Sequence, residues 1–272
     1  MNDRTIDEKR SALIRNLSGM GAVCVAFSGG VDSTYLLASA KEALGGEVLA
    51  VTARSPAFPE REVSAAAALC RQFGVPHEII ETDELSEPGF ADNPANRCYL
   101  CKSALFRRVR DAAARHGITM IAEGSNVDDL GDYRPGLGAV AELGIRSPLR
   151  AAGLTKAEIR ELSRREGLST WDKPSFACLF SRFPHGERMT KEKLEMIGRS
   201  EQYLLDLGFR QTRVRVHGDL ARVEVGADEL DRLFDPETRA AVREALLGIG
   251  FAYVTADLGG YRTGSMNPGY IK

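Results

Sequence analysis

The chain has 272 residues, 43% of them hydrophobic and 27% charged, and its formal net charge is −2. This composition is typical of a globular protein with one large core or two smaller ones. The balanced charge argues against a general affinity for nucleic acid or an anionic membrane. The charged amino-terminal stretch lacks the apolar core of a secretory signal, and no later stretch has the apolar length of a membrane helix. We therefore expect a cytoplasmic protein.

In the first half of the chain, short β-branched runs alternate with Ala-rich helical stretches. We predict strands at residues 21–27, 47–53, 77–80 and 118–122, and helices at 33–44, 60–73 and 99–116. Each helix ends near a glycine, as helix carboxyl ends prefer. This alternation is typical of a parallel sheet with crossover helices. The predicted fold class is α/β, with a doubly wound parallel sheet.

The pattern changes near residue 173, after a Gly- and Pro-rich segment at 132–150 and a short helix at 156–165. Beyond it we predict a helix at 190–207, a hairpin with strands 212–217 and 221–225, a helix at 236–247 and a strand at 251–256. These elements predict a smaller carboxyl-terminal α+β domain. The predicted domains are therefore residues 1–172 and 173–272.

An apolar strand runs directly into the sequence SGGVDS at residues 28–33, before the first helix of the alternation. Its glycines allow close approach to a phosphate, while the serines and the helix amides offer donors to an anion. Asp32 would repel a phosphate unless a cation intervenes, so it is predicted to bind Mg2+. No Walker GxxxxGK[ST] motif is present, which argues against γ-phosphoryl transfer.

SGGVDS in this setting resembles the PP-loop of the ATP pyrophosphatases, which include GMP synthetases, asparagine synthetases and RNA thiolation enzymes. The resemblance implies that ATP is cleaved between its α- and β-phosphates and that a substrate oxygen is adenylylated. Segments 51–55 and 123–129 follow other strands, where ligands of such sheets bind, although Asp128 and Asp129 also fit a solvated acidic turn. The predicted nucleotide-binding residues are Ser28, Gly29, Gly30, Val31, Asp32, Ser33, Ala53, Arg54, Gly124 and Ser125.

Three of the five cysteines form a pattern that suggests a metal site. Cys98 and Cys101 form a CxxC at a predicted helix start, where Arg97 and Lys102 favour thiolates, and Cys178 stands alone. Three thiolates can bind three irons of a cubane cluster and leave the fourth iron open to an exogenous sulfide.

Other interpretations of the cysteines remain open. A structural zinc site would need a fourth ligand, such as His116 or His185. A thioredoxin-like pair would leave Cys178 without a role. Cys24 and Cys70 lie in apolar or Ala-rich stretches and are expected to be core residues.

Over nearly its whole length the chain resembles the LarE sulfur transferases, which make the nickel-pincer nucleotide cofactor. The stretches that carry the resemblance are EGSNVDDLGDYRPG, SPLR, WDKPSFACLFSRFPHGERMT, RVRVH and DLGGYRTGSMN. In one branch of that family the cysteine matching Cys178 gives up its own sulfur. Another branch has two additional cysteines and holds a 4Fe-4S cluster, so Cys98 and Cys101 imply this second branch.

The resemblance implies a substrate, pyridinium-3,5-biscarboxylic acid mononucleotide, and the cofactors ATP, Mg2+ and a 4Fe-4S cluster. ATP would adenylylate a carboxylate, and sulfur would then displace AMP to give a thiocarboxylate. Residues 1–172 would be the PP-loop domain and residues 173–272 the sulfur-transfer and substrate domain. The resemblance also suggests a homohexamer and leaves the sulfide donor open.

A substrate with a phosphate and two carboxylates is expected to need cations where the two predicted domains meet. Arg213 and Arg215 alternate on one predicted strand, so their side chains share a face and could clamp an anion. An exposed, solvated strand face would explain the same pattern. With Cys178, Arg182 and Glu201 they form the predicted catalytic set, Glu201 by family position.

Three other functions fit parts of the sequence. A tRNA thiolation enzyme of the PP-loop class would also use three cysteines, but it needs a basic surface for RNA, and the basic clusters at 107–110 and 164–165 are short. A zinc-stabilised ATP-binding protein would not turn ATP over. An ammonia-using synthetase would leave the cysteines unexplained.

Overall fold

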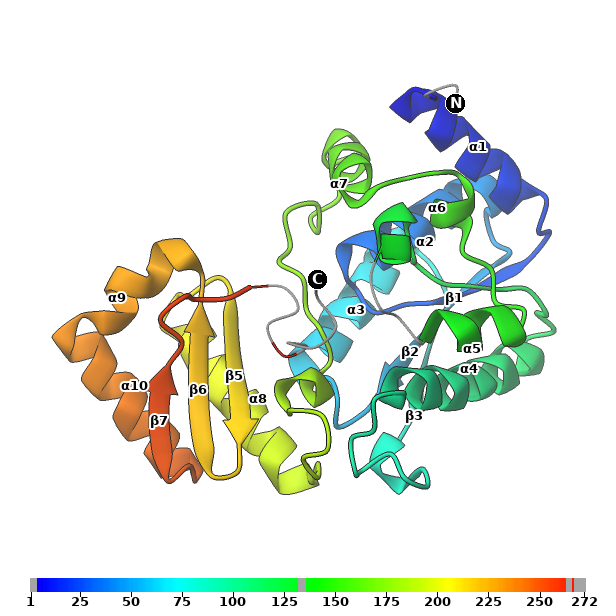
Figure 1. Ribbon diagram of the computed structural model, residues 1–272. Helices are drawn as coiled ribbons and strands as arrows, with labels where there is room; N and C mark the ends of the chain where they lie inside the picture. Colours follow the sequence, from blue (N-terminus) through cyan, green and yellow to red (C-terminus); the bar gives the residue numbers. More distant parts are fainter. Residues whose placement is uncertain (1–3, 132–135, 263–265, 267–272) are drawn as a thin grey trace. The chain divides into compact units, whose positions relative to one another are not determined.

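The computed structural model describes residues 4–131, 136–262 and 266 (Figure 1). Parts of the stretches at 123–136 and 257–267, and the start of the predicted loop at 132–150, lie outside the described residues. The chain forms two compact units. The first consists of Met1–Thr82 and Cys98–Ser175, and the second of Asp83–Arg97 and Phe176–Lys272.

The first unit contains a four-stranded parallel sheet with the order β3-β2-β1-β4. Its strands are β1 (Val23–Ala26), β2 (Val48–Arg54), β3 (His77–Glu81) and β4 (Ile121–Ala122). Val25 pairs with Ala50 on one side and Ala122 on the other, so β1 is central. Successive residues of β1 enter different cores, Val23 and Val25 on one face and Cys24 on the other. Both faces are therefore covered, which confirms the predicted fold class.

Helices cover both faces of this sheet (Figure 1). They are α1 (Ile6–Ser18), α2 (Val31–Leu44), α3 (Glu60–Phe73), α4 (Arg97–Arg115), α5 (Gly136–Glu142), α6 (Pro148–Ala151) and α7 (Lys156–Arg165). Helices α4 and α5 pack on the face with Cys24, and α1 and α2 on the other. None of the helices in the described part of the chain has both the length and the apolar character needed to cross a lipid bilayer.

Helix α1 is an element that the sequence interpretation missed. The Thr5 side chain accepts from the Glu8 amide, and the Glu8 carboxylate accepts from the Thr5 amide, which is a capping box. Leu13 and Leu17 are fully buried against the first core. The spacing of Thr5 and Glu8 before an apolar periodicity was the signal that could have predicted this helix.

The second unit contains a three-stranded sheet with the order β5-β6-β7. Strands β5 (Thr212–His217) and β6 (Leu220–Val225) form the predicted antiparallel hairpin, which turns through Gly218 at φ +59°, and β7 (Tyr253–Ala256) runs parallel to β6. Helix α8 (Lys191–Asp206) packs against β5 and α10 (Pro236–Ile249) packs against α8, with the short α9 (Leu230–Phe234) before α10. This is the predicted α+β arrangement.

Residues 83–97 pack with the second unit, although they lie between two elements of the first. Phe90 meets Phe180 edge to face with ring centroids 4.9 Å apart. Asn93 is fully buried and has φ +54°. Its side-chain amide donates to the carbonyl oxygen of Pro184 at 2.5 Å. The Met189 amide in turn donates to the carbonyl oxygen of Ala91 at 2.8 Å. The predicted division between residues 172 and 173 placed this segment in the first domain, whereas it packs with the second unit. The roles assigned to the two domains stay predictions.

We expect Asn93→Ala to lower the thermal unfolding midpoint more than Asn93→Gly. Both changes remove the buried amide and leave the Pro184 carbonyl without this donor, a loss of about 1–3 kcal/mol. Only alanine adds the steric penalty of a positive φ, about 1–2 kcal/mol in the left-handed region. Circular dichroism melting of the two variants tests this order, and an equal or reversed order would contradict it.

Candidate functional site

The SGGVDS loop joins the end of β1 to the start of α2. Gly29 has φ +67°, and a Cβ there would lie 3.4 Å from Ala66, so glycine suits both the conformation and the space. Ser28 Oγ lies 3.1 Å from Ser33 Oγ, which holds the loop closed. Gly30 is the N-cap of α2 and has no side chain to accept from the first helical amides. The backbone N–H groups at the start of α2 therefore point toward the loop, where an anion can bind.

Asp32, the predicted magnesium ligand, contacts two side chains from distant segments. Its Oδ2 lies 2.5 Å from Lys156 Nζ, and its Oδ1 accepts from Asn126 Nδ2 at 3.3 Å. Gly124 lies close by, because a Cβ there would be 3.1 Å from the Ser33 amide nitrogen. The structure therefore brings the loop after β4 against the SGGVDS loop. This was predicted, because both loops follow the carboxyl ends of parallel strands. The magnesium role of Asp32 stays a prediction.

The other residues of the 123–129 segment mainly hold that loop in shape. Glu123 accepts from Ser125 Oγ at 2.7 Å and from Ser147 Oγ at 2.5 Å. Asp129 is buried and accepts from the Asn126 amide at 2.9 Å, so it does not belong to a solvated acidic turn. Ser125 thus donates to a buried carboxylate, and its predicted contact with the nucleotide stays a prediction.

Lys173 adds a second cation at the SGGVDS loop. Its Nζ donates to the carbonyl oxygen of Gly29 at 3.0 Å and lies 2.8 Å from Glu62 Oε2. Neither Lys173 nor Lys156 was predicted as a site residue, since each is more than a hundred positions from the loop in sequence. An anion bound at the loop would meet two lysine side chains as well as backbone amides.

A small pocket of about 100 Å³ opens beside this loop, between the ends of β1 and β2. Its walls are mainly apolar, with Phe27, Thr52, Ala53, Phe58, Val63 and Leu105 among the lining residues. This lining suits a flat ring better than a phosphate. Ala53 lines the pocket as predicted, whereas Arg54 forms ion pairs with Glu60 and Glu81 at 3.0 and 2.9 Å and does not line it.

The cysteines differ in exposure. Cys98 is exposed and Cys101 half-buried at the start of α4, and Cys178 is half-buried before the 3₁₀ helix Leu179–Arg182. Cys24 and Cys70 are 0% and 1% exposed, which confirms them as core residues, and this burial raises the pKa of both thiols to about 12. Within the described residues no group of three or more His, Cys, Asp or Glu side chains is arranged to hold a metal ion. Because Cys178 belongs to the second unit, the three-cysteine site stays a prediction.

A buried ion pair anchors the Cys178 segment in the second unit. Arg182 and Glu201 are 0% and 1% exposed, and their side chains form two parallel bonds of 2.7 and 2.9 Å. Arg182 also donates to the carbonyl oxygens of Ala177 at 3.0 Å and Cys178 at 3.3 Å. Arg182 thus lies one turn from Cys178, and its guanidinium donates directly to the cysteine backbone.

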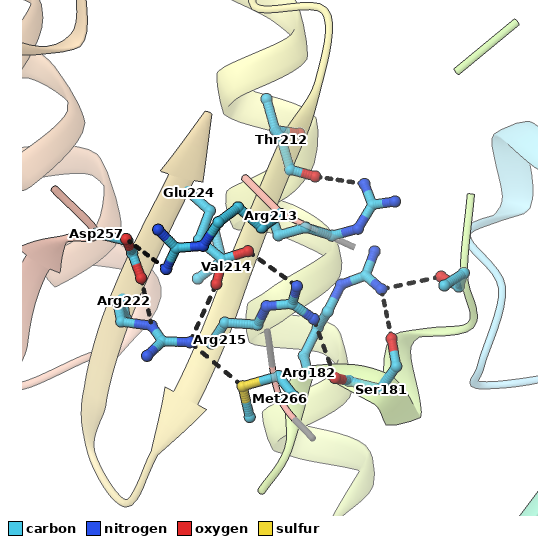
Figure 2. Close-up of polar contacts among 12 residues, drawn as sticks. Ser181, Arg182, Thr212, Arg213, Val214, Arg215, Arg222, Glu224, Asp257 and Met266 are labelled. Carbon is cyan, nitrogen blue, oxygen red and sulfur yellow. Dashed lines mark hydrogen bonds and ion pairs between the residues drawn. The ribbon is translucent and has the colours of Figure 1, made fainter. Parts of the chain in front are cut away.

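Arg213 and Arg215 lie beside Arg182, and Figure 2 shows the three guanidinium groups together. Arg213 and Arg215 are 4% and 5% exposed, so the alternative of a solvated strand face is wrong. Arg215 donates to the Ser181 carbonyl oxygen at 3.1 Å and to Glu224 at 2.8 Å. Arg213 donates to the Thr212 carbonyl oxygen at 2.6 Å and lies 4.9 Å above the Tyr261 ring.

The electrostatics of this cluster favour an added anion. Burial, together with the nearby Arg182 charge, lowers the pKa of Arg213 to about 10. Two buried carboxylates, Glu201 and Glu224, face three buried arginines. Glu224, which was not predicted, pairs directly with Arg213 across the hairpin register, so the predicted hairpin of strands 212–217 and 221–225 contained the signal needed to find it.

The parallel sheet and its SGGVDS loop define a PP-loop domain of the ATP-using type, and the asparagine synthase family profile matches residues 10–121. The chain is 37% identical over 264 residues to the pyridinium-3,5-bisthiocarboxylic acid mononucleotide synthase of Lactiplantibacillus plantarum, covering 97% of this chain and 95% of that protein. The chain therefore belongs to the LarE family of PP-loop enzymes.

Two further relatives extend over most of the chain. The uncharacterized protein slr1717 of Synechocystis sp. is 40% identical over 262 residues, which are 96% of this chain and 98% of the relative. The uncharacterized protein MJ0830 of Methanocaldococcus jannaschii is 27% identical over 241 residues, 89% of this chain and 91% of the relative. The similarity thus includes both compact units.

We expect Lys173→Ala to weaken ATP binding about tenfold, equivalent to about 1.4 kcal/mol. The change removes a cation and a bond to Gly29, and it leaves Glu62 without its lysine partner near the loop. Isothermal titration of ATP measures the effect. Lys41→Ala is a matched control, because Lys41 also donates to a glycine carbonyl, that of Gly74, at the other end of α2. Equal ATP affinity in the two variants would contradict the assigned role.

We expect Arg182→Met and Arg213→Met to change stability in different ways. Arg182→Met leaves Glu201 buried without its cation, which destabilises a protein by about 3–5 kcal/mol. Arg213→Met removes a buried cation that Arg182 repels, so the melting temperature is retained or rises. Thermal unfolding without ligands compares the variants, and a similar loss in both would contradict this electrostatic description.

Proposed function

We propose that the protein is an ATP-dependent sulfur transferase acting on pyridinium-3,5-biscarboxylic acid mononucleotide. It adenylylates a carboxylate of this substrate and converts it to a thiocarboxylate, in nickel-pincer cofactor synthesis. The observation that carries the proposal is the buried arginine cluster bonded to the backbone of Cys178. This cluster supports the proposal because it holds buried guanidinium groups next to a cysteine, in a chain 37% identical to a protein named as a synthase of the bisthiocarboxylic product.

The first unit supplies the groups for activating the carboxylate. A carboxylate is a poor electrophile until AMP becomes its leaving group. The α2 amides and Lys173 would hold the triphosphate, and the apolar pocket beside Ala53 would take the adenine ring. Asp32 would hold Mg2+, which neutralises phosphate charge when bound. Lys156 forms an ion pair with Asp32 in the free protein. When ATP is bound, the Lys156 ammonium group would also contact a phosphate oxygen.

The second unit supplies the groups for positioning the substrate. Planar guanidinium groups bind carboxylates and phosphates through paired bonds. Arg213 and Arg215 are already buried and ordered by contacts with Thr212, Ser181 and Glu224. A substrate carboxylate bound here would restore the charge balance and lie next to the Cys178 segment. Glu201 would act through Arg182 by fixing its orientation.

Cys98, Cys101 and Cys178 are the residues that would hold a 4Fe-4S cluster. All three are at least partly exposed thiols, unlike Cys24 and Cys70, so the donor set suits an accessible site. When bound, the cluster would supply an iron-held sulfide as the sulfur nucleophile. The protein itself would then be unchanged after each turnover.

The structure gives less support to the tRNA thiolation alternative. Four basic residues of the two short clusters are engaged within the protein, since Arg108 and Arg110 donate to the carbonyl oxygens of Glu81 and Leu143, and Arg164 and Arg165 bond to Glu161. RNA recognition would need these charges at a continuous surface. The zinc-stabilised binding protein differs from our proposal in its metal and in the absence of turnover.

The proposed function is tested by anaerobic reconstitution with iron and sulfide, followed by turnover with ATP and the biscarboxylate. We expect about four irons per chain in the wild type, as for a cubane cluster, and their loss in Cys98→Ala, Cys101→Ala and Cys178→Ala. Pyrophosphate release that depends on the biscarboxylate, and mass spectrometry of the thiocarboxylate, measure the reaction.

Cys70→Ala is the control, because this buried thiol should leave the iron content unchanged. Binding of zinc in place of iron, without substrate-dependent pyrophosphate release, would contradict the proposal and favour the zinc-stabilised protein. Turnover without iron would retain the sulfur transferase and reject the cluster, and Cys178 would then be tested as a donor of its own sulfur.

A further inference from the structure

The first unit has a second pocket at the edge of the sheet opposite the SGGVDS loop. It is open, has a volume of about 570 Å³, and lies between the end of α1, the residue before β4 and the start of α6. Met20 precedes β1 and Met120 precedes β4, so the pocket lies at the amino ends of these parallel strands. The SGGVDS loop follows the carboxyl end of β1. The two sites are therefore separate.

Three arginines, Arg15, Arg146 and Arg150, line this pocket, and its lining includes no Asp or Glu. Many arginines of this protein are paired, as Arg10, Arg54 and Arg165 are with carboxylates within 4 Å. Among the described residues, no hydrogen-bond or ion-pair partner is found for the side chains of Arg15, Arg146 and Arg150. Three like charges thus converge on one hollow in a chain whose net charge is −2.

The position of the arginines is fixed by the fold. Arg15 lies in the last turn of α1, which packs against α6, and Arg150 lies within α6. Arg146 pairs with Ala122 as a parallel bridge, and its amide donates to the Ile121 carbonyl oxygen at 2.9 Å. The backbone that carries these side chains is therefore ordered without a ligand.

The lining also has an apolar part, formed by Met20, Met120, Ile145 and Pro148. Methionine side chains adapt to flat rings, and arginines bind phosphate through paired donors. A volume of about 570 Å³ lies within the range of small-molecule sites. We infer that this pocket binds a nucleoside monophosphate, with its phosphate on the arginines and its base against the methionines.

This inference does not depend on the proposed sulfur transfer, because the pocket shares no residue with either the SGGVDS loop or the Cys178 cluster.

Equilibrium dialysis of the full chain with radiolabelled AMP tests the inference. We expect Arg146→Gln combined with Arg150→Gln to lose one bound AMP per chain relative to the wild type, or to bind it at least about tenfold more weakly. Arg15→Gln, at an exposed position of α1, provides an independent variant and should weaken the same site. Arg243→Gln is the control, because Arg243 is an exposed arginine of α10 outside the pocket and should retain wild-type binding.

ATP affinity, measured in parallel, verifies that the variants fold and keep the SGGVDS site intact. The same number of AMP molecules bound with the same affinity in wild type and arginine variants would overturn the inference. Inorganic pyrophosphate is the second probe. If it binds at the arginines more tightly than AMP, the assignment of a nucleoside ligand is overturned.

Discussion

The bond between Arg182 and Glu201 determines the arrangement of the candidate sulfur site. Both side chains are withdrawn from water, which is unfavourable for two charges unless geometry and further hydrogen bonds compensate. Glu201 also accepts from the Val214 amide at 3.0 Å, and Arg182 also binds the Cys178 carbonyl oxygen. One ion pair therefore connects helix α8, strand β5 and the cysteine segment. An apolar pair of the same volume could pack there, but it could not hold these backbone groups in place.

The same cluster shows why a group of buried arginines can lower the stability of the free protein. Burial and a like charge depress the pKa of Arg213, so the charged form is less stable here than in water. A bound carboxylate or phosphate would reverse this effect, because it would replace lost hydration with paired bonds. The arginines are already oriented by Ser181, Thr212 and Glu224, so little ordering remains to be done on binding.

Local sequence patterns predicted the fold well, because alternating β-branched and Ala-rich segments with glycine ends determine a parallel sheet almost by themselves. They also predicted that Arg213 and Arg215 share a face. Their burial depends on Glu224, which the predicted hairpin could have placed, and on Glu201 from a separate helix, which no local pattern could place. Lys156 and Lys173 escaped prediction for the same reason: only the fold brings them to the SGGVDS loop. Spacing likewise identifies Cys98 and Cys101 as a pair but does not place Cys178 beside them.

The two units carry different cations at their candidate anion sites. At the SGGVDS loop, backbone amides and lysines predominate, and the compact lysine charge suits phosphates whose oxygens change position during reaction. In the second unit, arginines predominate, and their planar groups suit a carboxylate that must keep one orientation. This division agrees with a reaction in which phosphate groups leave and a carboxylate stays in place. A net charge of −2 is therefore compatible with two local groups of cations, lysines at the SGGVDS loop and arginines in the second unit, which bulk composition cannot distinguish.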